Sequence, residues 1–204
     1  MKIYLDQTKF ATQKLIEIIN HDLKKLNNIQ SRLDNLPATL DAHKQAFELH
    51  EFSPDANHYY AIAMKAYDDK DKIQKELYLE MAAMLKEKDT NYHSICALSG
   101  ALLQIAKQGI STKYGRDVKE APKGELLRGV PLRDIVWEGR NQSLHYEDCN
   151  PHAAVKSLFK NLKMKFEEFG TWEPWDGTNY AARLIEILGW SDYDQYHNHM
   201  NSLS

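Results

Sequence analysis

Apolar residues recur along most of the chain at spacings of three and four positions, the spacing that places residues on one face of an α-helix. The clearest case runs from about Asp6 to Leu33, with apolar positions at Phe10, Leu15, Ile18, Ile19, Leu23, Leu26, Ile29 and Leu33. Proline lacks the amide hydrogen that a helix interior uses, so Pro37 ends this helix or lies just beyond its end. We therefore predict a long amphipathic helix at the start of the chain.

The next part of the chain continues the helical pattern with interruptions. Ala38 to Phe52 is a shorter predicted helix, and Ser53-Pro54-Asp55 has the composition of a helix start. From Ala56 to Lys88 the apolar spacing is helical again, and we expect a turn in the charged cluster Asp68 to Lys72. The pattern therefore predicts several consecutive helices over this part of the chain.

Two stretches follow that differ in kind. Asp89 or Thr90 is expected to cap the next helix, which ends near Gly109. Residues Ser111 to Val130 contain three glycines and a proline, with interleaved basic residues at Lys113, Arg116, Lys119, Lys123 and Arg128. We expect an irregular connection there. It is either a functional loop that guides a phosphate backbone or a solvated linker.

The last third of the chain is helical as well. Pro131 opens a helix, and Asn150-Pro151 starts another that Gly170 stops. The aromatic tail is expected to form one or two short helices that dock on the core. No alternating pattern predicts a strand. We predict an all-α helical bundle that forms a single domain over residues 1–204.

Composition and charge narrow the class of protein. The chain has 204 residues, of which 43% are hydrophobic and 27% charged, as in ordinary globular proteins. A formal net charge of −3 argues against a nucleic-acid coat protein but allows an enzyme that contacts RNA at one small cleft. No apolar stretch approaches the roughly 20 residues of a membrane span. Two cysteines, Cys96 and Cys149, form no metal or disulfide framework, so we expect a reduced, cytoplasmic setting.

One helix combines an apolar stripe with candidate chemistry. On a helical wheel the stripe contains Leu132, Ile135, Val136, Gly139 and Ser143. Arg140 lies at its edge, and His145 lies about 140° round the helix from Arg140. The two side chains diverge within one chain unless the helix bends, but they can converge if two copies pack across a two-fold axis. The small Gly139 and Ser143 would allow the close approach of two such helices.

These residue types suit cleavage of RNA, which carries its own nucleophile in the 2′-OH. A neutral imidazole such as that of His145 can accept the 2′-OH proton, and a second imidazole can protonate the leaving 5′-oxygen. The Arg140 guanidinium can hold the phosphate as charge develops on it. Asn141 can orient either group or bind the phosphate. The scheme assigns no step to a cofactor or a metal ion.

The segment Arg140-Asn141-Gln142-Ser143-Leu144-His145 resembles the R-x(4–6)-H motif of HEPN domains, including the polar residue directly after the arginine. The resemblance implies an α-helical, dimerising ribonuclease that cuts RNA without metal at the dimer interface, often as a toxin or in phage defence. It places the HEPN-like core at about residues 55–170, with a C-terminal helical extension over 171–204. In one subset of the family a tyrosine two positions after the histidine is modified. Here Tyr146 follows His145 directly, so that control is not expected.

The resemblance implies Arg140, Asn141 and His145 as the site residues of an endoribonuclease that leaves a 2′,3′-cyclic phosphate and a 5′-hydroxyl. RNA, a second copy of the chain and an antitoxin or regulatory protein are the implied partners. The alternatives are a HEPN-like module that binds RNA or a nucleotide without cutting it, and a dimerising interaction subunit. In a purely structural role, Arg140 would pair with Glu138 or Asp134 and His145 would cap a helix end.

Two other groups of residues offer weaker candidates. His197 and His199 lack further metal ligands in the sequence nearby, so a frayed terminal helix is expected there rather than a metal site. The pair Trp172 and Trp175 can stack on bases, but packing in the core or an interface is the preferred interpretation.

Overall fold

The computed structural model describes residues 1–50, 56–167 and 176–204, and the side chains of 36–71, 73 and 74 also lie outside the description. The chain divides into two compact units. Unit 1 contains Met1–Leu23 and His93–Ser204, and unit 2 contains Lys24–Tyr92. The described elements are helices apart from one two-stranded hairpin, which confirms the predicted all-α fold.

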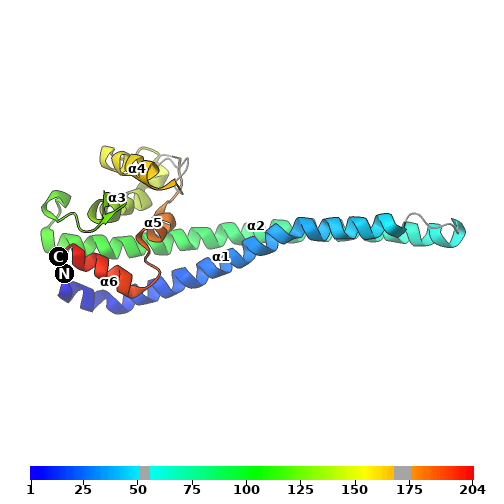
Figure 1. The fold of residues 1–204 in the computed structure, drawn as a ribbon, viewed down its shortest axis with the longest axis horizontal. Helices are drawn as coiled ribbons and strands as arrows, with labels where there is room; N and C mark the ends of the chain where they lie inside the picture. The colour runs from blue at the N-terminus through cyan, green and yellow to red at the C-terminus, as the bar shows by residue number, and fades with distance from the viewer. Residues whose placement is uncertain (51–55, 168–175) are drawn as a thin grey trace. The chain divides into compact units, whose positions relative to one another are not determined.

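The first two helices are longer than the sequence pattern predicts. Helix α1 covers Lys2–His50 and passes through Pro37, so the expected helix end there is wrong (Figure 1). Proline costs an interior hydrogen bond and about 3 kcal/mol. Because most helical stability in proteins comes from packing rather than from local propensity, a helix of 49 residues can contain such a defect. The predicted start at Ser53-Pro54-Asp55 lies outside the described residues.

Helix α2 covers Ala56–Tyr114 and runs through three predicted breaks, so the turn at Asp68 to Lys72, the cap at Asp89 or Thr90, and the end near Gly109 are all wrong. The Thr90 hydroxyl donates to the carbonyl oxygen of Lys86 at 2.9 Å, inside the helix. A Cβ at Gly109 would lie 2.9 Å from the Tyr4 ring, so the glycine admits an aromatic neighbour.

Unit 2 is an antiparallel pair formed by the second part of α1 and the first part of α2. Its apolar contacts centre on Ile29 and Met84, with Leu33, Leu77 and Met81 packed against them. Ion pairs flank this stripe: Lys25 Nζ lies 2.9 Å from Glu87, and Arg32 lies 2.9 Å from Glu80. Later residues of α1 therefore pair with earlier residues of α2, as in a helical hairpin.

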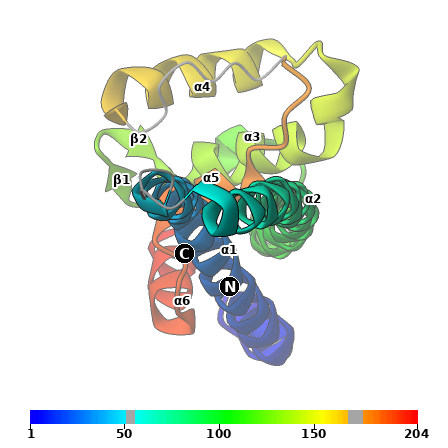
Figure 2. The same cartoon turned by 90° about the vertical axis from the view of Figure 1, so that its right-hand side faces the viewer.

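Unit 1 adds four helices to the ends of α1 and α2. These are α3 (Leu132–His145), α4 (Ala153–Lys165), α5 (Ala181–Leu188) and α6 (Tyr193–Ser202). Helix α3 begins directly after Pro131, as predicted, and the tail forms two short helices, also as predicted. Figures 1 and 2 both show α3 between α4 and the C-terminal part of α2. Helix α4 ends at Lys165, where Phe166 has an extended backbone, so the predicted continuation to Gly170 is wrong. The pair Trp172 and Trp175 lies outside the described residues.

The irregular segment after α2 contains a short hairpin that the sequence pattern does not predict. Strand β1 (Leu126–Leu127) pairs with β2 (Val130–Pro131), and a 3-10 turn, η1, covers Val118–Glu120. The two turn residues, Arg128 and Gly129, have φ values of 47° and 86°. Positive φ at both central positions matches the tight turn that two-residue hairpins favour. Strands of two residues are too short to produce an alternating pattern.

The predicted apolar stripe of α3 is buried, and it is buried within the protomer. Leu132, Ile135, Val136, Gly139 and Ser143 are all covered. A Cβ at Gly139 would lie 2.5 Å from Leu184 of α5, and Gly100 of α2 faces Ser143. The expectation that Gly139 and Ser143 admit a second copy of the chain is therefore wrong, because α5 and α2 already occupy their face.

Gly139→Ala is expected to destabilise unit 1, because Leu184 is fully buried and has little room to move. Overpacking costs about 1–3 kcal/mol, partly offset by the roughly 1 kcal/mol that alanine gains over glycine in a helix. Gly100→Ala is the matched control, since its Cβ would lie 3.4 Å from the Ser143 hydroxyl. Urea unfolding followed by far-UV circular dichroism should show Gly139→Ala as the less stable of the two; equal midpoints would contradict the packing.

The C-terminal helix is a packed element rather than a frayed end. His199 of α6 is 1% exposed, and its Nδ1 accepts a hydrogen bond from Trp190 Nε1 at 2.9 Å. Burial lowers the pKa of His199, while the nearby Glu125 carboxylate acts in the opposite direction. The expectation of a frayed helix at His199 is therefore wrong. The residue fixes the tail to the core.

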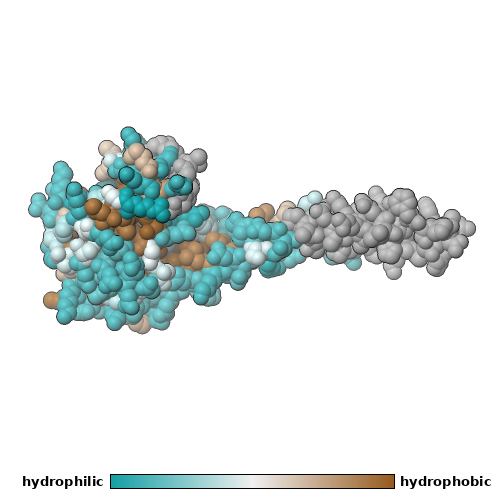
Figure 3. All heavy atoms as spheres, in the orientation of Figure 1, coloured by the Kyte–Doolittle hydropathy of each residue, from teal (hydrophilic) through white to brown (hydrophobic). Residues whose placement is uncertain are grey.

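On the face drawn in Figure 3, hydrophilic residues cover most of the described part, and apolar residues gather in smaller areas. None of the described helices has an apolar stretch of the length and hydropathy required to span a bilayer.

Candidate functional site

The last turn of α3, which carries the motif residues, is anchored on its buried side by Gln142. The Gln142 amide donates to the carbonyl oxygen of Thr178 at 2.6 Å and accepts from the Tyr180 backbone N–H at 3.1 Å. The Asn179 side chain donates to the carbonyl oxygen of Ser143 at 3.3 Å. These bonds fix the rotation of the helix. They determine which way Arg140 and Asn141 point.

Arg140 is half-buried, and amides rather than carboxylates hold it. Its Nε donates to Gln104 Oε1 of α2, and its Nη1 donates to Asn141 Oδ1 at 3.3 Å. Among the residues that the structure describes, no carboxylate forms an ion pair with it. Asp134 pairs with Arg133 at 2.8 Å, and Glu138 accepts from Asn141 Nδ2 at 3.1 Å. The purely structural pairing considered for Arg140 is therefore not formed.

Basic side chains lie near Arg140, in addition to the Glu138 carboxylate that shares the Asn141 amide with it. Lys107 of α2 lies with Nζ 4.4 Å from the centre of the Trp137 ring. Its pKa is lowered by burial, then by the like charges of Arg140 and Arg116. Burial also lowers the pKa of Arg140, although a guanidinium stays protonated in proteins. Like charges held together at a protein surface favour an anionic ligand.

His145 ends α3, and its backbone leaves the helical region with φ −125° and ψ 19°. The 3-10 turn η2 (Tyr146–Asp148) follows and returns Asp148 to the imidazole, where Nδ1 lies 3.3 Å from Oδ2. The His145 side chain makes no capping hydrogen bond and is 60% exposed. Its ring is thus oriented by a carboxylate and open to solvent, which leaves Nε2 accessible.

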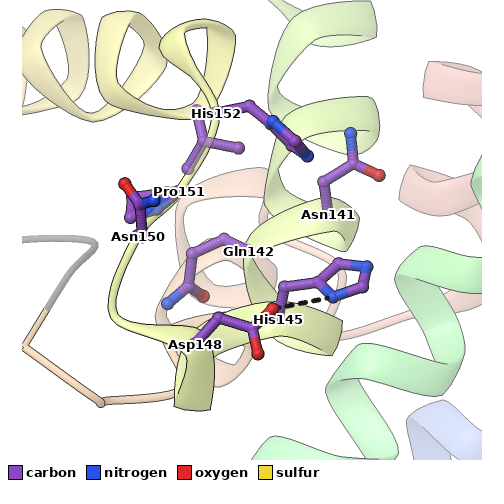
Figure 4. A pocket seen from close by; sticks show the side chains of 8 residues that line it. Asn141, Gln142, His145, Asp148, Asn150, Pro151 and His152 are labelled. Carbon is purple, nitrogen blue, oxygen red and sulfur yellow. Dashed lines mark ion pairs between the residues drawn. The ribbon is translucent and has the colours of Figure 1, made fainter.

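A pocket of about 210 Å³ lies beside these residues, where α3 ends and α4 begins (Figure 4). It is lined by Asn141, Gln142, His145, Asp148, Asn150, Pro151, His152 and Val155. The volume is below the roughly 300–1,000 Å³ of pockets for drug-sized ligands. A pocket of this size admits a small ligand or one part of a larger ligand.

The pocket contains two of the three residues chosen from the sequence. Asn141 and His145 line it, whereas Arg140 contacts it through the Asn141 amide. Sequence reasoning missed Asp148 and His152. The available signal was their place in the chain: Asp148 lies between two predicted helices, and His152 directly follows the predicted start of the second helix at Asn150-Pro151. A short connection there returns residues to the end of the motif helix.

Glu138 is linked to the pocket through Asn141, which lines the pocket and donates a hydrogen bond to the Glu138 carboxylate. Burial raises the pKa of its carboxyl most strongly, and Asp134 raises it further. The hydrogen bond from Asn141 and the charge of His152 lower it. His152 thus lies near enough to Glu138 to interact with it electrostatically. Among the described residues, no three histidine, cysteine or acidic side chains are gathered as a metal site.

Comparisons with protein-family models, curated proteins and solved structures found no match. The HEPN resemblance therefore stays a prediction that depends on the motif in α3.

Proposed function

We propose that this protein is an endoribonuclease of the HEPN type that cleaves RNA by attack of the 2′-OH on the adjacent phosphate. The observation that supports the proposal most is the shared pocket of Asn141 and His145, with Arg140 held against the Asn141 amide. A guanidinium with no carboxylate partner in the described structure retains N–H donors for a phosphate. The proposed biological role is that of a toxin or phage-defence effector.

The proposed reaction begins at His145. We assign the proton of His145 to Nδ1, which lies 3.3 Å from Asp148 Oδ2, so that Nε2 carries the lone pair. It accepts the 2′-OH proton as the 2′-oxygen attacks phosphorus. The bond from phosphorus to the 5′-oxygen breaks, leaving a 2′,3′-cyclic phosphate and a 5′-hydroxyl. Arg140 and Asn141 stabilise the charge that gathers on the non-bridging oxygens.

A homodimer is part of the proposal, because a second copy can bring another Arg140 to the site. The face with Gly139 and Ser143 is covered within the protomer, so the contact would use the exposed end of α3. Leu144, next to His145, is 53% exposed and suits such a contact.

The proposal is tested by digesting end-labelled RNA with the purified protein in EDTA. We expect cleavage with cyclic phosphate and 5′-hydroxyl ends, and no cleavage where the ribose at the cut position lacks its 2′-OH. His145→Ala guards against a contaminating nuclease, and His21→Ala is its matched control, since His21 also has a carboxylate partner, Asp22, at 3.0 Å. Binding without cleavage, or cleavage that needs an added divalent ion, would refute the proposal.

A further inference from the structure

We propose that His152 is the general acid of this site, so that both imidazoles of the cleavage reaction come from one protomer. The inference rests on the proposed ribonuclease function. It changes the expected arrangement, in which a second imidazole arrives from a second copy of the chain. It also assigns chemistry to a residue outside the motif in α3.

The first observation is the position of His152 in the chain. It lies directly before α4 with extended backbone angles (φ −60°, ψ 158°), and its side chain makes no capping hydrogen bond. Val155, one turn later, is 2% exposed and lines the same pocket, which fixes the start of α4 there. An exposed imidazole on a fixed backbone is available to a ligand.

The second observation is the position of His152 relative to the motif residues. His145 and His152 line one pocket, from the end of α3 and the start of α4. Figure 4 shows the His152 imidazole beside the Asn141 side chain, with the His145 ring on the other side of the Asn141 backbone, next to Asp148. A phosphate bound at Asn141 would therefore lie between two imidazoles that approach it from different elements.

The imidazoles of His145 and His152 have different neighbours, and we assign them different roles, base and acid. Asp148 holds His145 Nδ1 at 3.3 Å and leaves Nε2 to accept the 2′-OH proton. The His152 imidazole lies beside the Asn141 side chain (Figure 4), whose Nδ2 donates to Glu138 at 3.1 Å. As the bond from phosphorus to the 5′-oxygen breaks, protonated His152 gives its proton to that oxygen. One proton is taken and one is given, so the two rings end with exchanged protonation states.

The test separates acid catalysis from other losses by changing the leaving atom. Two RNA oligonucleotides of the same sequence are compared, one of them with sulfur in place of the bridging 5′-oxygen at the cut position. A thiolate leaves without prior protonation because thiols ionise near pH 8.5, whereas an alcohol needs a proton from an acid. His152→Ala is expected to slow cleavage of ordinary RNA by about 10²–10⁴-fold and that of the sulfur-containing RNA by less than 10-fold.

His145→Ala is expected to slow cleavage of both oligonucleotides, because each reaction needs the base. His21→Ala should leave both rates unchanged. Wild-type rates for His152→Ala on ordinary RNA, or an equal loss on the two substrates, would overturn the inference and leave the proposed function standing. Failure of the wild-type protein to cut either substrate, or undiminished cleavage by His145→Ala, would instead refute the function itself. Circular dichroism spectra confirm that each variant is folded.

Discussion

Arg140→Ala is expected to lower kcat/KM for RNA cleavage by about 10²–10³-fold, the usual loss when one preorganised donor to a developing oxyanion is removed. The guanidinium is oriented by Gln104 and Asn141, so its position is fixed before the substrate binds. Because no carboxylate pairs with Arg140 among the described residues, the phosphate need not displace an internal anion. Steady-state rates on a single oligonucleotide measure the effect.

The control for this experiment is Arg183→Ala. Arg183 lies on α5, outside the pocket, and has a carboxylate partner, Glu186, at 3.0 Å. Its removal should leave the cleavage rate unchanged. Arg140→Lys should recover only part of the activity, because an ammonium keeps the charge but loses the planar donor pair. A wild-type rate for Arg140→Ala would exclude the guanidinium from the reaction. Equal cleavage rates for Arg140→Lys and the wild-type protein would show that a positive charge at this position is sufficient for the reaction.

The motif helix could be predicted well because its pattern is periodic. The wheel predicts a buried stripe from Leu132 to Ser143, with Arg140 at its edge, and the structure confirms both. The partners of that stripe could not be predicted. Gly139 packs against Leu184, which lies 45 positions later in the chain, and no local pattern encodes such a contact. Gly139 and Ser143 therefore suggested contact with a second copy of the chain, whereas α5 of the same chain packs against Gly139.

The pocket could be predicted only in part for a related reason. Asn141 and His145 are visible as a motif, but His152 joins them through the connection between α3 and α4. That connection contains a 3-10 turn and Cys149 in the left-handed region at φ 51°. An L-residue other than asparagine or aspartate rarely adopts that conformation. The sequence therefore indicates a connection at Asn150-Pro151 but not the backbone conformation that returns the chain to the end of α3.

The long helices show that local break signals are weaker than packing between helices. Asp68 to Lys72, Thr90 and Gly109 each suggest an interruption, yet α2 continues through all of them. Each signal costs a helix on the order of 1 kcal/mol, and the apolar stripe on either side persists. Where the side chains are described, from about residue 75 onward, buried apolar positions recur on both sides of Thr90, and their burial exceeds such a cost. At Gly109 the missing side chain even improves the contact with Tyr4.

Trp190→Ala is expected to destabilise unit 1 by about 3–5 kcal/mol, the range for removal of a buried aromatic side chain. Trp190 is 1% exposed and packs edge-on against Tyr196, with ring centres 4.8 Å apart. Its indole N–H donates to His199, so the substitution also leaves a buried nitrogen without its donor. Urea unfolding followed by far-UV circular dichroism measures the loss, and amide exchange in α5 assigns it to unit 1.

Trp190→Phe divides the loss, because it keeps a buried six-membered aromatic ring and removes the N–H group together with the five-membered part of the indole. We expect it to retain more stability than the alanine variant and to lose roughly 1–3 kcal/mol. The effect should extend to the pocket. Trp190 directly follows α5 and its cap Gly189, and Leu184 of that helix packs on Gly139 of α3. Weaker packing of α5 against α3 would destabilise the position of the helix that carries Arg140. Unchanged stability in both variants would mean that the tail does not hold α3 in place.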